Sequence, residues 1–89
     1  MNDALQTDEY SISLSREIAV CKGIIDQQRR ALSRFEQLYK IPTEKMLHDK
    51  NLQAGITDRD LSQWRNGHET LFIWQQRLRE YEEAYVALR

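Results

Sequence analysis

KIPTEKMLHDKNLQAGITDRD, residues 40–60, separates two long segments that both have the apolar spacing of an amphipathic helix. A helical hairpin needs only a few residues to reverse direction, so a connector of this length must have structure of its own. Thr43 follows Pro42 and marks a helix start, and we expect Gly55 to end that helix in the left-handed conformation. We therefore predict a short helix over residues 44–53, with Leu47 and Leu52 buried against the end of the hairpin.

The segment before the connector predicts one long helix over residues 12–39. Its apolar residues recur at alternating intervals of three and four, which places them on one face of a helix. These residues are Leu14, Ile18, Cys21, Ile25, Leu32, Phe35 and Tyr39, with Gln28 as the polar position. Ile24, Ala31 and Leu38 widen the apolar stripe, whereas the outer positions are mostly charged and include Glu36. Such a helix is roughly 42 Å long, and Pro42 prevents it from continuing.

The segment after the connector predicts a second long helix, over residues 58–88. The same spacing holds for Trp64, Gly67, Leu71, Trp74, Leu78, Tyr81, Tyr85 and Leu88. At its start, Thr57 can cap the helix and Asp60 can return a hydrogen bond in a capping box. Two matched amphipathic helices in succession favour an antiparallel hairpin.

Composition supports a single all-α domain. The 89 residues include three glycines and one proline, too few for the turns that β-hairpins and nucleotide-binding loops require. A chain of this size buries only about 60–65% of the surface of its unfolded form, and small helical proteins often gain stability by oligomerising. We expect residues 1–11, which are polar, to be frayed.

Charge and cysteine usage limit the partners and the compartment. Thirteen basic and 14 acidic side chains nearly balance, which argues against a dedicated binder of nucleic acid or of anionic membranes. Cys21 is the single cysteine, so an internal disulfide is excluded and a reducing cytosol is the expected location. The start, MNDALQTDEY, has no apolar stretch of the kind found in secretory signals. We also predict no membrane span.

The stretch RFEQLYKIPTEKMLHDKNLQAGITDRDLSQW, residues 34–64, resembles a group of small bacterial helical proteins. In that group, a Y/F-E-x-x-Y-G-M-S-S-x-x-F segment leads through a short helix to G-x-L, then D-x-D-x-x-x-W, then a final helix. The matching residues here are Phe35, Glu36, Tyr39, Thr43 as the cap, Gly55, Ile56, Asp58, Asp60 and Trp64. Lys40 stands where the pattern has glycine, and Met46 where it has an aromatic residue.

This resemblance implies a role in protein binding. Members of the group look like the smaller partner of two-gene, toxin–antitoxin-like modules. For this chain, the resemblance implies an antitoxin-like subunit that binds a second protein encoded nearby.

The polar residues give little indication of a metal-binding, cofactor or catalytic site. His48, Asp49, Asp58, Asp60 and His68 are the candidate metal-binding or acid–base set. They lack the spacing of helical metal motifs, and Asp58 and Asp60 suit a helix start, so we predict no metal, cofactor or catalytic site. Cys21 falls in the apolar stripe and should be a small buried hydrophobe. Trp64, Trp74, Tyr81 and Tyr85 have the spacing of packing residues.

The lead hypothesis is a non-enzymatic helical interaction protein, a homodimer of two hairpins in a four-helix bundle. Leu61, Phe72 and Ile73 add apolar surface to the second long helix. The candidate interface comprises Ile24, Gln28, Ala31, Gly67, Leu71, Phe72, Trp74 and Tyr81, and the candidate docking residues for a partner are Met46, Leu47 and Leu52. The alternative is a nucleic-acid-associated regulator that uses the face formed by Arg29, Arg30 and Arg34.

Overall fold

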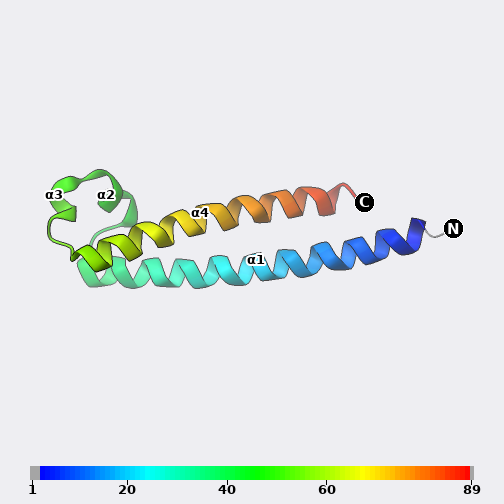
Figure 1. Cartoon of the computed structure of the whole chain (residues 1–89), viewed down its shortest axis with the longest axis horizontal. Helices are drawn as coiled ribbons and strands as arrows, with labels where there is room; N and C mark the ends of the chain where they lie inside the picture. Colours follow the sequence, from blue (N-terminus) through cyan, green and yellow to red (C-terminus); the bar gives the residue numbers. More distant parts are fainter. Residues whose placement is uncertain (1–2, 89) are drawn as a thin grey trace.

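The computed structural model describes the backbone of residues 3–88 and the side chains of residues 9–88, and it is a long antiparallel helical hairpin (Figure 1). Helix α1 spans Asp3–Tyr39 and helix α4 spans Asp58–Val86. Two short helices, α2 (Thr43–His48) and α3 (Lys50–Gln53), connect them at one end. Across residues 3–88 no strand occurs. The prediction of an all-α hairpin with helical structure in the connector is confirmed.

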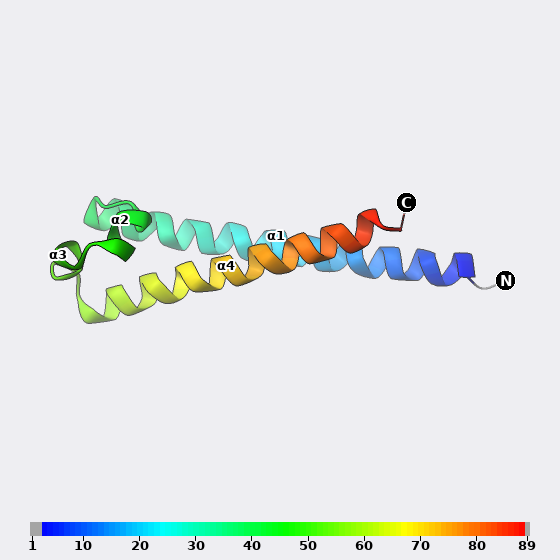
Figure 2. The ribbon, with the colours of Figure 1, turned by 90° about the horizontal axis from the view of Figure 1, so that it is seen from above.

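The hairpin is a narrow rod that widens at the connector. Its dimensions are 63 × 18 × 17 Å. Figures 1 and 2 show α1 and α4 running beside each other, with α1 extending beyond the end of α4. In Figure 2 the two long helices diverge towards the end where α2 and α3 lie. We call this end the closed end.

The helix boundaries differ from the predicted ones in three places. Helix α1 begins at Asp3 rather than at residue 12; residues 3–22 contain neither glycine nor proline, and a helix extends at little cost once formed. The predicted helix over 44–53 is interrupted at Asp49, whose carboxylate accepts hydrogen bonds from the backbone N–H groups of Asn51 and Leu52 and so starts a new helix. Helix α4 ends at Val86, two residues before the predicted end.

The turns at the two ends of the connector also correct the sequence analysis. Lys40 adopts a left-handed backbone with φ of 60°, directly after the last residue of α1. No glycine within the described residues has a positive φ, so Gly55 does not end α3 in the predicted way. Instead, the backbone N–H groups of Ala54, Gly55 and Ile56 bond to carbonyls three or four residues earlier and close the turn.

The well-buried core lies at the closed end. Leu32, Met46, Ile56 and Trp64 form its centre, and Phe35, Tyr39, Ile41, Leu47, Leu61 and Leu71 pack against it. Met46 and Trp64 are fully buried. The prediction for the connector is therefore partly wrong: Leu47 and Leu52 are half-buried, and Met46 and Ile56 fill the end of the hairpin.

Along the rest of the rod the core is thin. Leu14, Cys21 and Ile25 of α1 are buried there, but α4 contributes half-buried residues opposite them, including Trp74, Leu78 and Tyr81. Among the described residues of α4, Trp64 alone is classed as buried. One helix cannot enclose the apolar stripe of another by itself, so this part of the hairpin remains open at its sides.

Candidate functional site: a polar cluster and an apolar face

A hydrogen-bonded cluster at the closed end ties α1, α2 and α4 together. The indole N–H of Trp64 donates to the hydroxyl of Thr43 at 2.9 Å. That hydroxyl and the backbone N–H of Thr43 both donate to Oε2 of Glu36, at 2.9 and 2.8 Å. The predicted capping role of Thr43 is therefore wrong: Pro42 precedes the first turn of α2, and the Thr43 side chain bonds to α1 and α4 instead.

Aromatic stacking and a second hydrogen bond surround this cluster. The rings of Phe35 and Tyr39 both stack on Trp64, with centroid distances of 5.5 and 5.9 Å. The hydroxyl of Tyr39 donates to the carboxylate of Asp60, which directs this carboxylate to α1. Thr57 caps α4 as predicted, by accepting from the backbone N–H of Asp60.

The cluster contains most of the residues on which the resemblance to bacterial proteins was based. Phe35, Glu36, Tyr39, Thr43, Asp60 and Trp64 all lie in it, and their contacts are with one another. The contacts of Thr43 hold the connector between the long helices, and the other contacts join α1 directly to α4. In this chain, the pattern therefore specifies how the hairpin closes.

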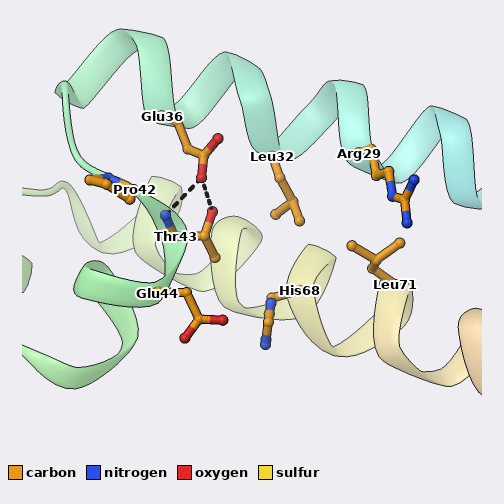
Figure 3. Close-up of a pocket in the computed structure, with 8 residues that line it drawn as sticks. All are labelled: Arg29, Leu32, Glu36, Pro42, Thr43, Glu44, His68 and Leu71. Carbon is orange, nitrogen blue, oxygen red and sulfur yellow. Dashed lines mark hydrogen bonds between the residues drawn. The ribbon is translucent and has the colours of Figure 1, made fainter.

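A shallow pocket of about 390 Å³ lies beside the cluster, between α1, α2 and α4 (Figure 3). Glu36 and Pro42 lie at one end of it, and Arg29 and Leu71 at the other. His68 also lines it, but the other members of the candidate metal-binding set do not. Asp49 starts α3, and Asp60 bonds to Tyr39. Among the described residues, no three His, Cys, Asp or Glu side chains converge in a way that could hold a metal ion.

The candidate docking residues of the connector are less accessible than predicted. Met46 is fully buried in the core, so it cannot be presented to a partner in this conformation. Leu47 and Leu52 are half-buried, and Leu47 packs against the core. Gln53 fixes the connector further, since its amide donates to the carbonyl of Met46 and accepts from the guanidinium of Arg65 in α4.

The basic residues of α1 do not form a single uncompensated face. Arg30 pairs with Asp26 one turn earlier, at 2.9 Å, and both side chains are exposed. Arg29 lies about 100° around the helix from Arg30, where it lines the pocket of Figure 3.

The candidate interface residues divide into three groups. The first group belongs to the contact between α1 and α4 and comprises Gln28, Gly67 and Leu71. A side-chain carbon on Gly67 would lie 3.3 Å from Leu32 and 3.6 Å from Gln28. Leu71 packs against the core. The helix that passes close to Gly67 is therefore α1 of the same chain. Phe72 is 57% exposed and lies on the outer side of α4. The remaining four are Ile24, Ala31, Trp74 and Tyr81.

These four residues belong to one side face of the hairpin. Val20, Ile24, Ala31 and Leu38, spaced by four and seven, share a flank of α1 about 90° from the buried line through Cys21 and Leu32. The opposite flank of α1 carries Lys22 and Arg29, and a shallow pocket places these residues beside Gln75 and Leu78 of α4. The flank with Val20 therefore shares the other face of the hairpin with the corresponding flank of α4. We call this surface the charge-poor face, composed of Val20, Ile24, Ala31, Leu38, Thr70, Trp74 and Tyr81.

Charged groups are scarce on the charge-poor face. The α1 residues that define this flank are uncharged, but Arg34, three residues after Ala31 and four before Leu38, lies at its outer edge. Arg77 lies at the edge on α4, with its guanidinium 4.6 Å from the ring centroid of Trp74. Burial raises the pKa of the nearby Cys21 thiol, Glu17 raises it further, and Arg77 acts in the opposite direction. Cys21 is fully buried, as predicted.

Comparisons with protein-family models, with curated proteins and with solved structures each gave no match. The resemblance of residues 34–64 to bacterial antitoxin-like proteins stays a prediction from the sequence. Within the part of the chain that the structure describes, no helix combines the length and apolar character needed to span a membrane.

The roles of Glu36, Thr43 and Lys40 were not predicted from the sequence. Glu36 was assigned to the outer surface and Thr43 to a local cap, yet both bond across elements. One signal was available: a buried tryptophan usually requires an acceptor for its N–H, and Thr43 offers a hydroxyl within the connector. A signal was also available for the left-handed Lys40, because the resembling pattern has glycine at this position and glycine favours that conformation.

Proposed function

We propose that this chain is a non-enzymatic protein-interaction module that associates with itself and serves as an adaptor or antitoxin-like subunit for a second protein. The observation that carries the proposal is the large surface that the hairpin leaves open. Its accessible area is 6795 Å², whereas a compact monomer of 10.6 kDa is expected to expose about 5,500 Å².

The shape of the molecule supports the same proposal. Its radius of gyration is 18.2 Å, compared with about 12 Å for a compact domain of this length. The buried core is concentrated at the closed end, and the rest of the rod has an incompletely covered apolar stripe. Association would cover that stripe and supply the stability that a small core lacks.

A rigid closed end suits an adaptor. The cluster around Trp64 fixes α2 and α3 against both long helices, so the end of the rod presents one defined shape. A preorganised surface binds a partner at lower entropic cost than a loose loop. A cytosolic location belongs to the proposal, because it keeps Cys21 reduced.

Light scattering coupled to gel filtration tests the self-association. We expect a mass of twice the 10.6 kDa chain at micromolar concentration. A mass of one chain that persists when the protein is concentrated to the millimolar range would refute self-association and leave the open stripe without the use proposed for it.

A further inference from the structure

We infer that the charge-poor face is the contact surface for a second copy of this chain, and that two hairpins pack through it about a two-fold axis to form a four-helix bundle. This inference rests on the proposed self-association and adds which surface is used. It divides the molecule into one associating face, one charged face and the outer sides of the two helices.

Exposure of large apolar side chains is the first step. Val20 and Leu38 lie at the two ends of the α1 flank and are 52% and 65% exposed. Between them, Ile24 and Ala31 are half-buried, as are Trp74 and Tyr81 on α4. These side chains are partly covered by the hairpin contact and still have an exposed side. Contiguous apolar surface of this kind is uncommon on soluble monomers and is typical of an interaction site.

Area is the second step. The chain exposes about 1,300 Å² more than a compact monomer of its mass. A standard protein–protein interface buries about 800 Å² on each partner, and obligate dimers bury more. The excess exposed area of the whole chain is therefore large enough to include an interface of the size that stable dimers need.

Charge distinguishes this face from the opposite one. The opposite face is lined along its length by Lys22, Asp26, Arg29 and Glu82, which suit contact with water. On the charge-poor face, the charged residues Arg16, Glu17, Arg34 and Arg77 lie at the edge, and the face between them is uncharged. Two copies of this face can therefore meet through uncharged side chains while the charged groups stay at the edge, in contact with water. A two-fold contact pairs a surface with itself and requires this self-compatibility.

The smallest side chains of the face lie near its middle. Gly67 lies against Leu32, so Ala31 and Thr70, one and three residues away, lie at nearly the same height on the rod. Larger side chains lie on both sides of them. Leu38 lies towards the closed end, and Ile24 and Trp74 lie towards the opposite end of the rod. A two-fold axis that crosses the rod near Ala31 and Thr70 places the small residues of both copies together. It also sets the Val20 end of each α1 against the Leu38 end of the other.

Charge substitutions at the two most exposed positions of the face test the inference. The double variant Val20→Glu/Leu38→Glu and its counterpart Val20→Lys/Leu38→Lys should each raise the dissociation constant of the dimer at least about 100-fold, because like charges would be forced together in a desolvated contact. Light scattering at 10–20 times the wild-type dissociation constant should then report one chain for each variant alone. Mixing the two variants in equal amounts should restore a mass of two chains.

The mixing step keeps the test independent of whether the separate variants stay folded. A helical dimer that forms in the mixture alone supports the inference even if each variant by itself loses helix by circular dichroism. The matched control is Ile12→Glu/Phe72→Glu, which places two charges at apolar positions that are similarly exposed, 54% and 57%, on the outer sides of the helices. This control should keep the wild-type mass.

The outcomes separate the inference from the proposed function. If the wild-type chain is monomeric at every concentration, self-association itself fails. If the wild type is dimeric but the Val20/Leu38 variants remain dimeric, or if their mixture stays dissociated, the charge-poor face is not the contact and only this inference fails. Dissociation of the Ile12/Phe72 control to the same extent would likewise overturn it.

Discussion

Thr43 accepts a hydrogen bond from the indole N–H of Trp64, 21 residues further along the chain, at 2.9 Å. The same hydroxyl donates to Glu36, so one small side chain joins the end of α1, the start of α2 and the first turns of α4. Thr43 is itself buried, and both of its long-range partners lie at the closed end, where the core is densest. The connector is thus fixed by polar contacts as well as by apolar packing.

Replacing Thr43 with valine should destabilise the protein by about 1–3 kcal/mol. Valine keeps the shape of threonine but removes the hydroxyl, which leaves the buried N–H of Trp64 without its acceptor. Urea unfolding followed by circular dichroism measures the free energy of unfolding, at one fixed protein concentration for all variants.

Thr43→Ser is the matched control, because it removes a methyl group and retains the hydroxyl. We expect serine to lose less stability than valine, although valine is closer in shape to threonine. If serine is the more damaging substitution, packing of the methyl group outweighs the hydrogen bonds and the importance given to the hydroxyl is wrong.

Lys40→Gly should stabilise the hairpin by about 1 kcal/mol. Lysine pays a steric penalty at φ of 60° that glycine avoids. The lysine side chain is exposed, so its removal uncovers little of the core. An increase in the melting temperature checks the prediction, and Lys40→Ala serves as the control, because alanine removes the same side chain and keeps the steric penalty. Equal effects of glycine and alanine would show that the left-handed backbone is not the cause.

The long helices were predictable because their signal repeats. Each apolar residue of α1 and α4 adds to the same 3.6-residue period, so no single position decides the result. The connector depends on single residues instead. Asp49 could be read as a helix interior or as a cap, and Gly55 as a left-handed stop or as an ordinary turn residue. In each case, the choice is made by contacts with other elements, and those contacts are not local in the sequence.

The apolar face was predictable in part for the same reason. Ile24, Ala31, Trp74 and Tyr81 follow from spacing along each helix, and they do share a face. Which flank of α1 meets which flank of α4 depends on how the two helices are rotated about their axes. Spacing alone does not specify this rotation, so Phe72 was grouped with residues that lie on a different side of the molecule.

Gly23→Ala and Gly67→Ala should have different effects on stability. Both glycines lie within long helices, where alanine is favoured by about 1 kcal/mol. A side-chain carbon at position 23 would meet no atom within 4 Å, so Gly23→Ala should gain nearly all of that amount. At position 67 the same carbon would lie 3.3 Å from Leu32, and the buried leucine must shift to accommodate it.

Thermal unfolding of the two variants at equal concentration provides the comparison. We expect Gly67→Ala to be close to neutral, and Gly67→Val to be destabilised by about 1–3 kcal/mol because it adds more volume to the same contact. A Gly67→Ala variant as stable as Gly23→Ala would mean that α1 and α4 are less closely packed at Leu32 than the structure shows.

Alkaline pH should lower the stability of the wild-type protein through Cys21. Burial raises the pKa of this thiol in the folded state, and Glu17 raises it further. An unfolded cysteine ionises near pH 8.5. Below that pH both states hold the proton, so the contribution of Cys21 to stability is fully present. As the pH rises above it, the unfolded chain releases the proton before the folded one does, and the free energy of unfolding decreases. The measured quantity is the difference in the free energy of unfolding between the wild type and Cys21→Ala, which isolates the contribution of the thiol. That difference should be constant between pH 6 and 8 and should change in favour of the alanine variant between pH 8.5 and 10.

A difference that stays constant up to pH 10 would show that the thiol ionises as readily in the folded chain as in the unfolded one, which would contradict its burial between α1 and α4.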